Sequence, residues 1–246
     1  MIKRLLAVGF CSSFLFVMIA ASFVYPQEYR YPNRDLRNLR LEDVRTRAQS
    51  TESAFAELSL SRDIPIGLEI SPNDTEFHEY SIEFKNGSLT ELMAALVSQN
   101  NLYTWEIANG VVHVYPSDRY RDTQLKDLLE TNVSKFEVKK GTSSWSLVSA
   151  LISAPEIQKA LVTNTLSYRP RSFSGGYIPQ LGKDFRSDGS NLALSSILNK
   201  VIKESPTAKF WVIKKHVNNP LEFSISISAK HEELPANTLN FPDREY

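Results

Sequence analysis

The sequence predicts an α+β protein built from two small βαββ-type modules, with mixed or antiparallel sheets and helices packed on one face. Three observations lead to this prediction. Residues 87–116 change from a helical spacing of apolar residues to the alternation of strands within a short stretch. A similar order of strand, glycine turn, helix and closing strands returns later in the chain. The 246 residues carry balanced charge and 42% hydrophobic side chains, which suits one large or two small folded domains.

The first module is predicted over residues 50–117 and begins with a helix and a strand. Ser50 can cap a short helix, and isoleucine and leucine alternate with other residues over 64–70, as in a strand with one buried face. The same alternation predicts a second strand over 80–85, which ends at Asn86-Gly87.

A capped helix and a hairpin complete this module. Ser88 and Glu91 have the spacing of a capping box, and apolar residues fill one face of the helix predicted over 89–99. Two short strands follow, joined by Asn109-Gly110, which is a strong signal for a two-residue hairpin turn. We expect the helix to pack across a sheet that the hairpin extends, because neither would be stable alone.

The second module is predicted over residues 118–230. A strand at 136–138 comes before a helix that Ser143 or Ser144 can cap, and the apolar face of this helix includes Trp145. The segment therefore repeats the strand, turn and helix of the first module.

The end of the second module repeats this pattern once more. Gly189 and Ser190 form the predicted turn and cap before a helix over 194–202. Closing strands are predicted over 208–216 and 221–228, and in the second of these strands aromatic or isoleucine residues alternate with serine.

A loop over residues 163–183 interrupts the second module, with no hydrophobic period and with prolines and a Gly-Gly pair. A structureless stretch of this length inside a compact domain is typically functional or mobile. Tyrosine and arginine are the side chains that most often anchor protein interfaces. The candidate interaction residues are Tyr168, Arg169, Arg171, Phe173 and Tyr177. A disordered insert is the alternative interpretation of the same loop.

The amino-terminal segment has the form of an export signal. Lys3 and Arg4 precede an apolar stretch over residues 5–24, and small residues near its end allow cleavage that removes residues 1–22. The same stretch is long enough to anchor the chain in the inner membrane if it is not cleaved. Arginines follow it closely, and the positive-inside rule could then leave the rest of an anchored chain in the cytoplasm. We predict a periplasmic or extracellular protein, with the inner-membrane anchor as the alternative.

Residues 23–49 are predicted to form a linker that leads into a short helix. Apolar residues recur near helical spacing among charged ones: Leu36, Leu39, Val44 and Ala48. We interpret this segment as a solvated spacer, with an arm that binds lipid headgroups or a partner as the alternative. At the other end of the chain, residues 231–246 are predicted to be a flexible tail.

No motif for catalysis, a cofactor or a metal is found. The four histidines are far apart, and the only cysteine, Cys11, lies in the apolar stretch, so the body has no cysteine metal site. The net charge of zero argues against nucleic acid as a partner. Trp105, Trp145 and Trp211 are interpreted as core residues. Binding of a ligand would instead need two of them exposed along one groove.

Residues 50–117 resemble the secretin and TonB N-terminal short domain, the STN family. The resemblance rests on the order of elements in AFAELSLSRDIPIGLEI, YSIEFKNGSLTELMAALVSQNNLYTWEI and NGVVHVYP, and a weaker βαββ echo follows over 184–228. It implies an envelope-facing module that docks onto other proteins or onto copies of itself. The pore or barrel that usually accompanies this domain has no counterpart after residue 117.

These observations together predict an exported, non-catalytic interaction or assembly protein of a bacterial cell envelope, with no cofactor. Its partner would be another protein or a second copy, and it would contact the membrane only through an uncleaved amino-terminal segment. Two alternatives stay open. The first is a periplasmic protein that binds a small ligand or a glycan. The second is a hydrolase whose site forms only in three dimensions, with a histidine within hydrogen-bond reach of a serine or a carboxylate.

Overall fold

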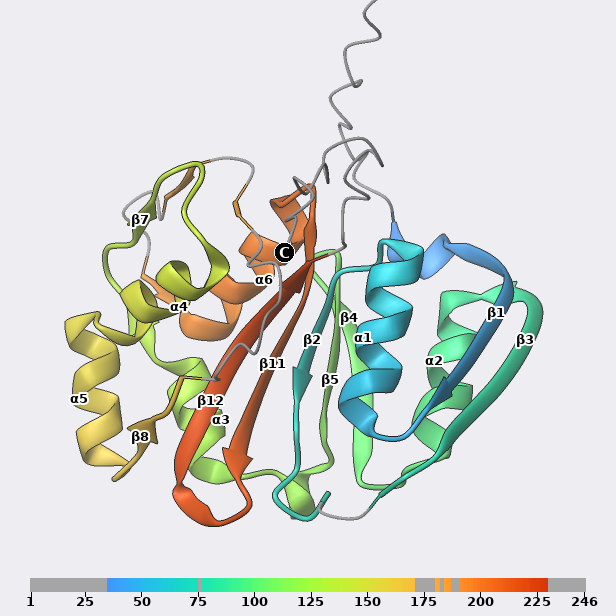
Figure 1. The fold of residues 1–246 in the computed structure, drawn as a ribbon, viewed down its shortest axis with the longest axis horizontal. Coiled ribbons are helices and arrows are strands. Elements are labelled where there is room, and N and C mark those ends of the chain that lie inside the picture. The colour runs from blue at the N-terminus through green and yellow to red at the C-terminus, as the bar shows by residue number, and fades with distance from the viewer. Residues whose placement is uncertain (1–34, 75–76, 171–179, 182–183, 187–190, 230–246) are drawn as a thin grey trace, which may run out of the picture. The chain divides into compact units, whose positions relative to one another are not determined.

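A six-stranded sheet runs through the protein and takes strands from both halves of the sequence (Figure 1). The structure, a computed structural model, describes residues 35–74, 77–170, 180–181, 184–186 and 191–229. In spatial order the strands are β4 (Tyr103–Ala108), β5 (Val111–Pro116), β2 (Ile66–Glu69), β11 (Ala208–His216), β12 (Asn219–Ala229) and β8 (Ser167–Tyr168). The strands β5, β2 and β11 are parallel, and β4 and β12 run antiparallel to their neighbours β5 and β11. The predicted α+β class with mixed and antiparallel sheets is confirmed.

The pairing of β2 with β11 joins the two segments that the sequence predicts as separate modules. Phe210 of β11 lies beside Ile66 of β2, and the parallel register continues to the end of β2. All four residues of β2 are buried, whereas the alternation predicted only one buried face. The reason is that Gly67 lies under Trp211 and Glu69 is paired with Arg121. The second face is therefore buried although its residues are not apolar.

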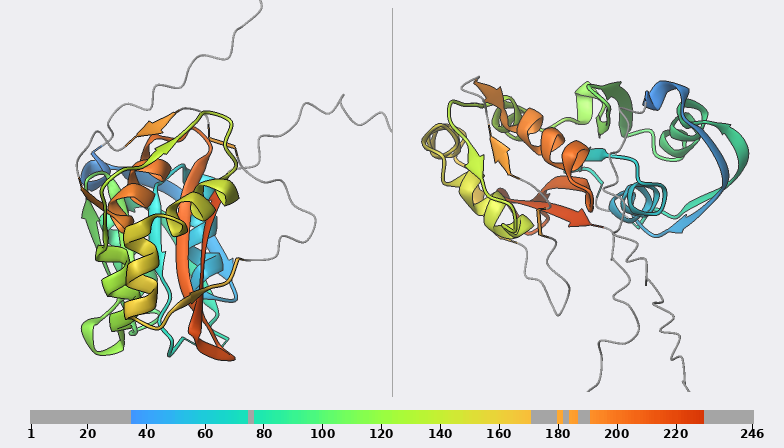
Figure 2. Two further views of the ribbon diagram at one scale, coloured as in Figure 1. Left: turned by 90° about the vertical axis from the view of Figure 1, so that its left-hand side faces the viewer. Right: turned by 90° about the horizontal axis from the view of Figure 1, so that it is seen from above.

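Helices cover both faces of this sheet, where the sequence predicted one. α1 (Thr51–Arg62) and α6 (Leu194–Glu204) both contact β2 and β11, and they lie on opposite sides of these strands (Figure 2, right). Phe210 and Val212 of β11 belong to the core beneath α1, and Trp211 and Ile213 belong to the core beneath α6. A central strand with two apolar faces needs a layer on each side to keep both from water.

The core on the α1 side also includes a two-stranded antiparallel sheet, formed by β1 (Arg40–Ala48) and β3 (Tyr80–Ser88), together with α2 (Leu89–Ser98) and the short helix η1 (Leu36–Asn38). The predicted short helix over residues 36–48 is therefore wrong, apart from the single turn of η1. Asp43, within this strand, has a positive φ of 47°, and Leu41 and Val44 on either side of it are both buried. Their spacing of three residues imitates a helix.

Local signals in this half are confirmed where they depend on near neighbours. Ser88 Oγ accepts a hydrogen bond from Glu91 N over 3.2 Å, and Glu91 Oε2 accepts one from Ser88 N over 2.7 Å, so the capping box forms at α2. Asn109 and Gly110 have φ values of 54° and 77° between β4 and β5. A type I′ turn requires two such positive values, and the pair supplies them.

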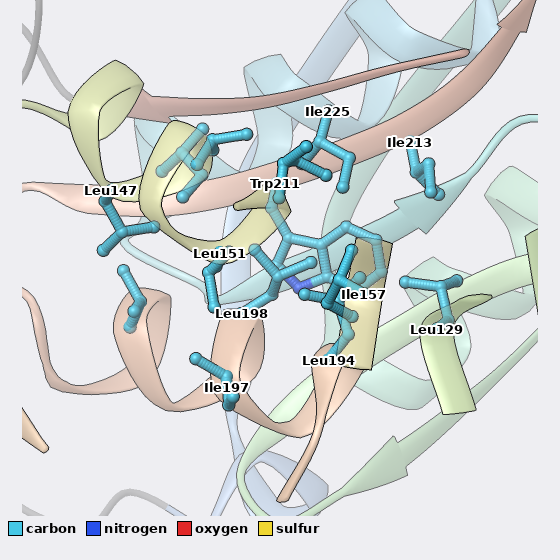
Figure 3. Packing of buried hydrophobic residues seen from close by; sticks show 14 of the residues in the cluster. Leu129, Leu147, Leu151, Ile157, Leu194, Ile197, Leu198, Trp211, Ile213 and Ile225 are labelled. Carbon is cyan, nitrogen blue, oxygen red and sulfur yellow. The ribbon is translucent and has the colours of Figure 1, made fainter. Parts of the chain in front are cut away.

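The core on the α6 side gathers the remaining helices around Trp211 (Figure 3). They are α3 (Thr123–Glu130), α4 (Ser144–Ile152) and α5 (Pro155–Thr163). Short pieces complete this half: η2 (Asp118–Tyr120), β6 (Asn132–Val133), β7 (Glu137–Val138), β9 (Phe185–Arg186) and β10 (Leu192–Ala193). Neither α3 nor α5 was predicted from the sequence, because each is short and contributes only two or three buried residues.

The caps of the second half are confirmed in part. Ser143 Oγ accepts a hydrogen bond from Ser146 N over 3.0 Å and caps α4 as predicted. α6 instead begins after Ala193 without a side-chain cap, and the predicted turn and cap residues Gly189 and Ser190 lie outside the described residues. The export signal or anchor, residues 23–34 of the linker and the tail also lie outside them.

Candidate functional site

Charged side chains gather where the parallel strands β5, β2 and β11 end. Arg121 Nε and Nη2 donate to the two carboxylate oxygens of Glu69 over 2.9 and 2.5 Å. The guanidinium carbon lies 4.9 Å from the centre of the Tyr115 ring. Burial raises the pKa of Glu69, and the hydrogen bonds and charge of Arg121 oppose the rise. Carboxyl ends of parallel strands are a common place for ligands, but here the buried charges are paired with each other.

Two lysines at the end of β11 hold helices on opposite faces of the sheet. Lys215 Nζ lies 2.7 Å from Asp122 Oδ2, and the other oxygen of Asp122 accepts from Leu125 N to cap α3. Lys214 Nζ lies 2.6 Å from Glu52 Oε2 in the first turn of α1. These pairs connect strand ends to helix starts, which is a structural use of charge.

Hydroxyl groups form a closed network near the start of α1. Asp74 Oδ2 accepts hydrogen bonds from Thr51 Oγ1 over 2.6 Å and from Tyr103 OH over 2.7 Å. Tyr103 OH in turn accepts from Ser71 N over 3.1 Å, and Thr51 Oγ1 lies 2.9 Å from Tyr80 OH. Burial, helped by the bond to Asp74, raises the pKa of Tyr103. The network fixes the loop after β2 and keeps both tyrosines protonated.

None of the three described histidines is hydrogen-bonded to a serine or a carboxylate, which the hydrolase alternative would need. His78 Nε2 lies 2.5 Å from the carbonyl oxygen of Gln99. His113 Nε2 lies 2.7 Å from Asn199 Nδ2. His216 Nε2 is buried without a hydrogen-bond partner. His113 is packed against the Trp211 ring in an edge-on contact.

The three tryptophans differ in exposure, although the sequence suggested core packing for all of them. Trp211 is buried, with 1% of its surface exposed, and Trp105 is half-buried. Trp145 is 47% exposed, so its assignment to the apolar face of α4 is wrong. It stands in the first turn of α4 and is not among the buried residues of that helix. With a single exposed indole, the groove required by the ligand alternative is not formed by these residues.

Trp145 borders an open, shallow apolar depression between α4 and the edge of the central sheet. Its lining comes from α4, β8 and β12: Ser144, Trp145, Val148, Tyr168, Ile225, Ser226 and Ile227. The Tyr168 ring packs against Phe223 with 5.7 Å between ring centres, and burial raises the pKa of its hydroxyl. No charged side chain is found among the described residues that line the depression.

Backbone groups of β12 beside this depression have no partner strand among the residues that the structure describes. Arg169 N donates to Phe223 O over 2.8 Å, so the backbone groups of Phe223 point outward, toward β8. Backbone direction alternates along a strand, so those of Ile225 and Ile227 point the same way. β8 pairs only with Glu222 and Phe223. Within the described part of the chain, no other strand pairs with β12 on this side.

The structure places two of the five predicted interaction residues at this edge. Tyr168 lines the depression, and Arg169 Nη1 lies 3.1 Å from Glu222 Oε2. Arg171, Phe173 and Tyr177 lie outside the described residues. Sequence analysis missed Trp145 and the edge of β12, although the uncharged alternation of isoleucine and serine after Phe223 was a signal for a sheet edge without protective charges.

No group of three or more histidine, cysteine, aspartate or glutamate residues could hold a metal ion in the described part of the chain. Among the helices that the structure describes, none is both long and apolar enough to cross a membrane.

Comparison of the chain with protein-family models, with curated proteins and with solved structures finds no match. The class of protein therefore has to be argued from the fold and from the sheet edge.

Proposed function

We propose that the protein is a non-catalytic interaction or assembly module of a bacterial cell envelope, exported by its amino-terminal segment. One observation carries this proposal: the exposed Trp145 stands beside an apolar depression at a sheet edge that β8 only partly covers. Exposed aromatic side chains next to apolar hollows are the usual anchors of protein interfaces. The signal-like residues 1–22 and the resemblance of residues 50–117 to an envelope domain support the location.

The arrangement of ionisable groups supports the non-catalytic part of the proposal. The buried charges Glu69 and Arg121 satisfy each other, and Asp122 with Lys215 forms a second closed pair. A catalytic acid or base has to reach a substrate from a cleft. The described residues that line the depression at Trp145 are instead mostly apolar, and their only ionisable or nucleophilic groups are the hydroxyl groups of serine and tyrosine.

The test is site-specific photo-cross-linking in intact bacteria that produce the full chain. A photoreactive phenylalanine analogue replaces Trp145, and a control replaces Val162, which is 79% exposed on α5. Cells are fractionated, and the mass of the mature chain is measured in the same samples. We expect a discrete cross-linked envelope protein from position 145 but not from position 162. A chain found in the cytoplasm without cross-links from either position would contradict the proposal.

A further inference from the structure

We infer that the outer edge of β12 binds an extended peptide strand of a partner protein, which pairs with Ile225 and Ile227 and places an apolar side chain against Trp145. This inference rests on the proposed function and adds the kind of partner and the mode of binding. It joins two observations, the unpaired backbone at the edge and the depression beside it, which share the residues Ile225 and Ile227.

The backbone groups require an extended partner. The backbone groups of even-numbered residues of β12 point toward β11, as those of Ser224 do toward Lys214. On β11, the carbonyl oxygen of Ile213 points the other way, toward β2, where it accepts a hydrogen bond from Ile70 N in the loop after β2. The N–H and C=O groups of Ile225 and Ile227 therefore face away from β11. Only another strand presents donors and acceptors at the spacing of alternate residues.

The existing partner strand stops before it reaches these groups. β8 ends at Tyr168, Arg169 donates the last backbone hydrogen bond to Phe223, and the next residue is Pro170. Among the described residues, none pairs with β12 beyond this bond. An incoming strand of a few residues would take the place along β12 that these described residues leave open.

The depression sets the chemistry of the incoming side chain. Trp145, Val148 and Tyr168 offer apolar and aromatic surface, and no charge lies among the lining residues. An aromatic or branched aliphatic side chain, which alternates with residues that point away, meets these requirements. The long edge strand β1 offers a contrast, because it carries exposed arginines and a positive φ at Asp43. Charged side chains and local irregularities of this kind protect a sheet edge from pairing.

A second copy of this chain fits the edge less well. If β12 paired with β12 of a copy about a two-fold axis at Ser226, Ile225 would face Ile227 and Phe223 would face Ala229. The position beside Phe223 is already taken by β8. A short peptide strand whose ends are free to turn away avoids this overlap.

The experiment uses the full chain in detergent solution and a synthetic heptapeptide in which threonine and valine alternate around a central phenylalanine. A matched probe has the same side chains but is N-methylated at the amides that would face β12. Hydrogen exchange is followed at single amides, together with the fluorescence of Trp145 against the Trp145→Phe variant. We expect the first peptide to slow exchange at Ile225 and Ile227 while Ser224 stays protected throughout. N-methylation should weaken binding by about tenfold or more.

Variants test the side-chain half of the inference. Trp145→Ala should weaken the heptapeptide by about tenfold, because exposed tryptophans that anchor a partner carry much of its binding energy. Phe77→Ala removes a side chain that is 69% exposed elsewhere and should leave the affinity unchanged. Both variants alter surface positions, and their folding is checked by thermal unfolding of the same samples.

Several outcomes would overturn the inference. Equal binding of the N-methylated peptide would exclude strand pairing. Protection at β1 would place the site on the two-stranded sheet of β1 and β3. Protection that rises with protein concentration would assign the edge to a second copy. Protection in the dilute, peptide-free chain that disappears when residues 230–246 are deleted would assign it to the chain's own carboxyl terminus. If the heptapeptide does not bind while position 145 still cross-links an envelope protein, the inference of strand pairing is wrong and the proposed function stands.

Discussion

The indole of Trp211 lies on the backbone of Gly67, at the point where the two halves of the chain share one sheet. A Cβ atom built on Gly67 would stand 2.4 Å from Trp211 Cε2, closer than any real side-chain contact. Trp211 Nε1 also donates to Asn199 Oδ1 over 2.8 Å, which fixes the ring over the glycine. The absence of a side chain at residue 67 thus makes room for the largest buried residue of the protein.

Gly67→Ala should lower the free energy of unfolding by about 1–3 kcal/mol, because overpacking displaces the ring or the strand. Urea unfolding followed by circular dichroism measures the change. In the Trp211→Leu background the same substitution should cost much less, since the obstructing ring is gone. Equal costs in both backgrounds would show that the contact is not the reason for the glycine.

Arg121→Met should destabilise the protein by about 3–5 kcal/mol at neutral pH, because it leaves the buried carboxylate of Glu69 without its partner. Burial already raises the pKa of Glu69, so the folded state takes up a proton more readily than the unfolded state. Stability linked to this group is present at low pH and is lost as pH rises through the folded-state pKa.

The Arg121→Met variant should therefore regain part of its stability when the pH is lowered from neutral toward the ordinary range of glutamate. Urea unfolding at a series of pH values measures this recovery. The double variant Glu69→Leu/Arg121→Met removes both charges and should show no such recovery. A single variant whose loss is independent of pH would contradict the assignment to Glu69.

His113→Gln should reduce the acid sensitivity of the fold. Burial lowers the pKa of His113, aided by the charge of Arg121 and opposed by that of Glu106. Asn199 presents its oxygen to Trp211, so its amide nitrogen donates to His113 Nε2, which must be unprotonated. A lowered pKa means that stability is present above the unfolded-state pKa and is lost as pH falls through the folded-state value.

Glutamine can accept the same hydrogen bond without taking up a proton. The unfolding free energy of the variant should therefore fall less steeply than that of the natural chain as the pH drops through the histidine range. His78→Gln serves as the control, because that ring hydrogen-bonds a backbone carbonyl outside this chain of contacts. Identical pH profiles for the natural chain and His113→Gln would contradict the prediction.

Ser88→Ala should lower stability by about 1 kcal/mol, since Ser88 Oγ accepts from Glu91 N and satisfies one of the free amides at the start of α2. Ser88→Asp keeps an acceptor at this position and should recover most of the loss. Thermal unfolding of the three proteins measures the order. If the aspartate variant is as unstable as the alanine variant, the hydroxyl does not act as a cap.

Much of the local structure could be predicted because its causes lie a few residues apart. The capping box at Ser88 and the turn at Asn109-Gly110 need only their own neighbours, and both formed as expected. The prediction of a helix over residues 36–48 was wrong because it also depended only on near neighbours. The positive φ of Asp43 shifted the alternation of a strand into a spacing typical of a helix, and only the pairing with β3 reveals the strand.

The candidate site could be predicted only in part. Tyr168 was expected to contact a partner, and it lines the depression, but the exposure of Trp145 depends on where α4 begins relative to the sheet. The free groups of Ile225 and Ile227 depend on the length of β8, which pairs with β12 at only two positions. Neither the exposure of Trp145 nor the length of β8 is encoded in a sequence motif.

The sequence by itself determined α2 with its capping box and the tight turn between β4 and β5, because caps, turn residues and apolar periods act over a few positions. Tertiary structure decided that β2 would pair with β11 and that both faces of the sheet would be covered. It also decided that, among the described residues, β8 pairs with β12 at only two positions beside the depression at Trp145. Strands far apart in the chain meet only when their pairing buries more apolar surface than separate modules could, and that balance belongs to the whole fold.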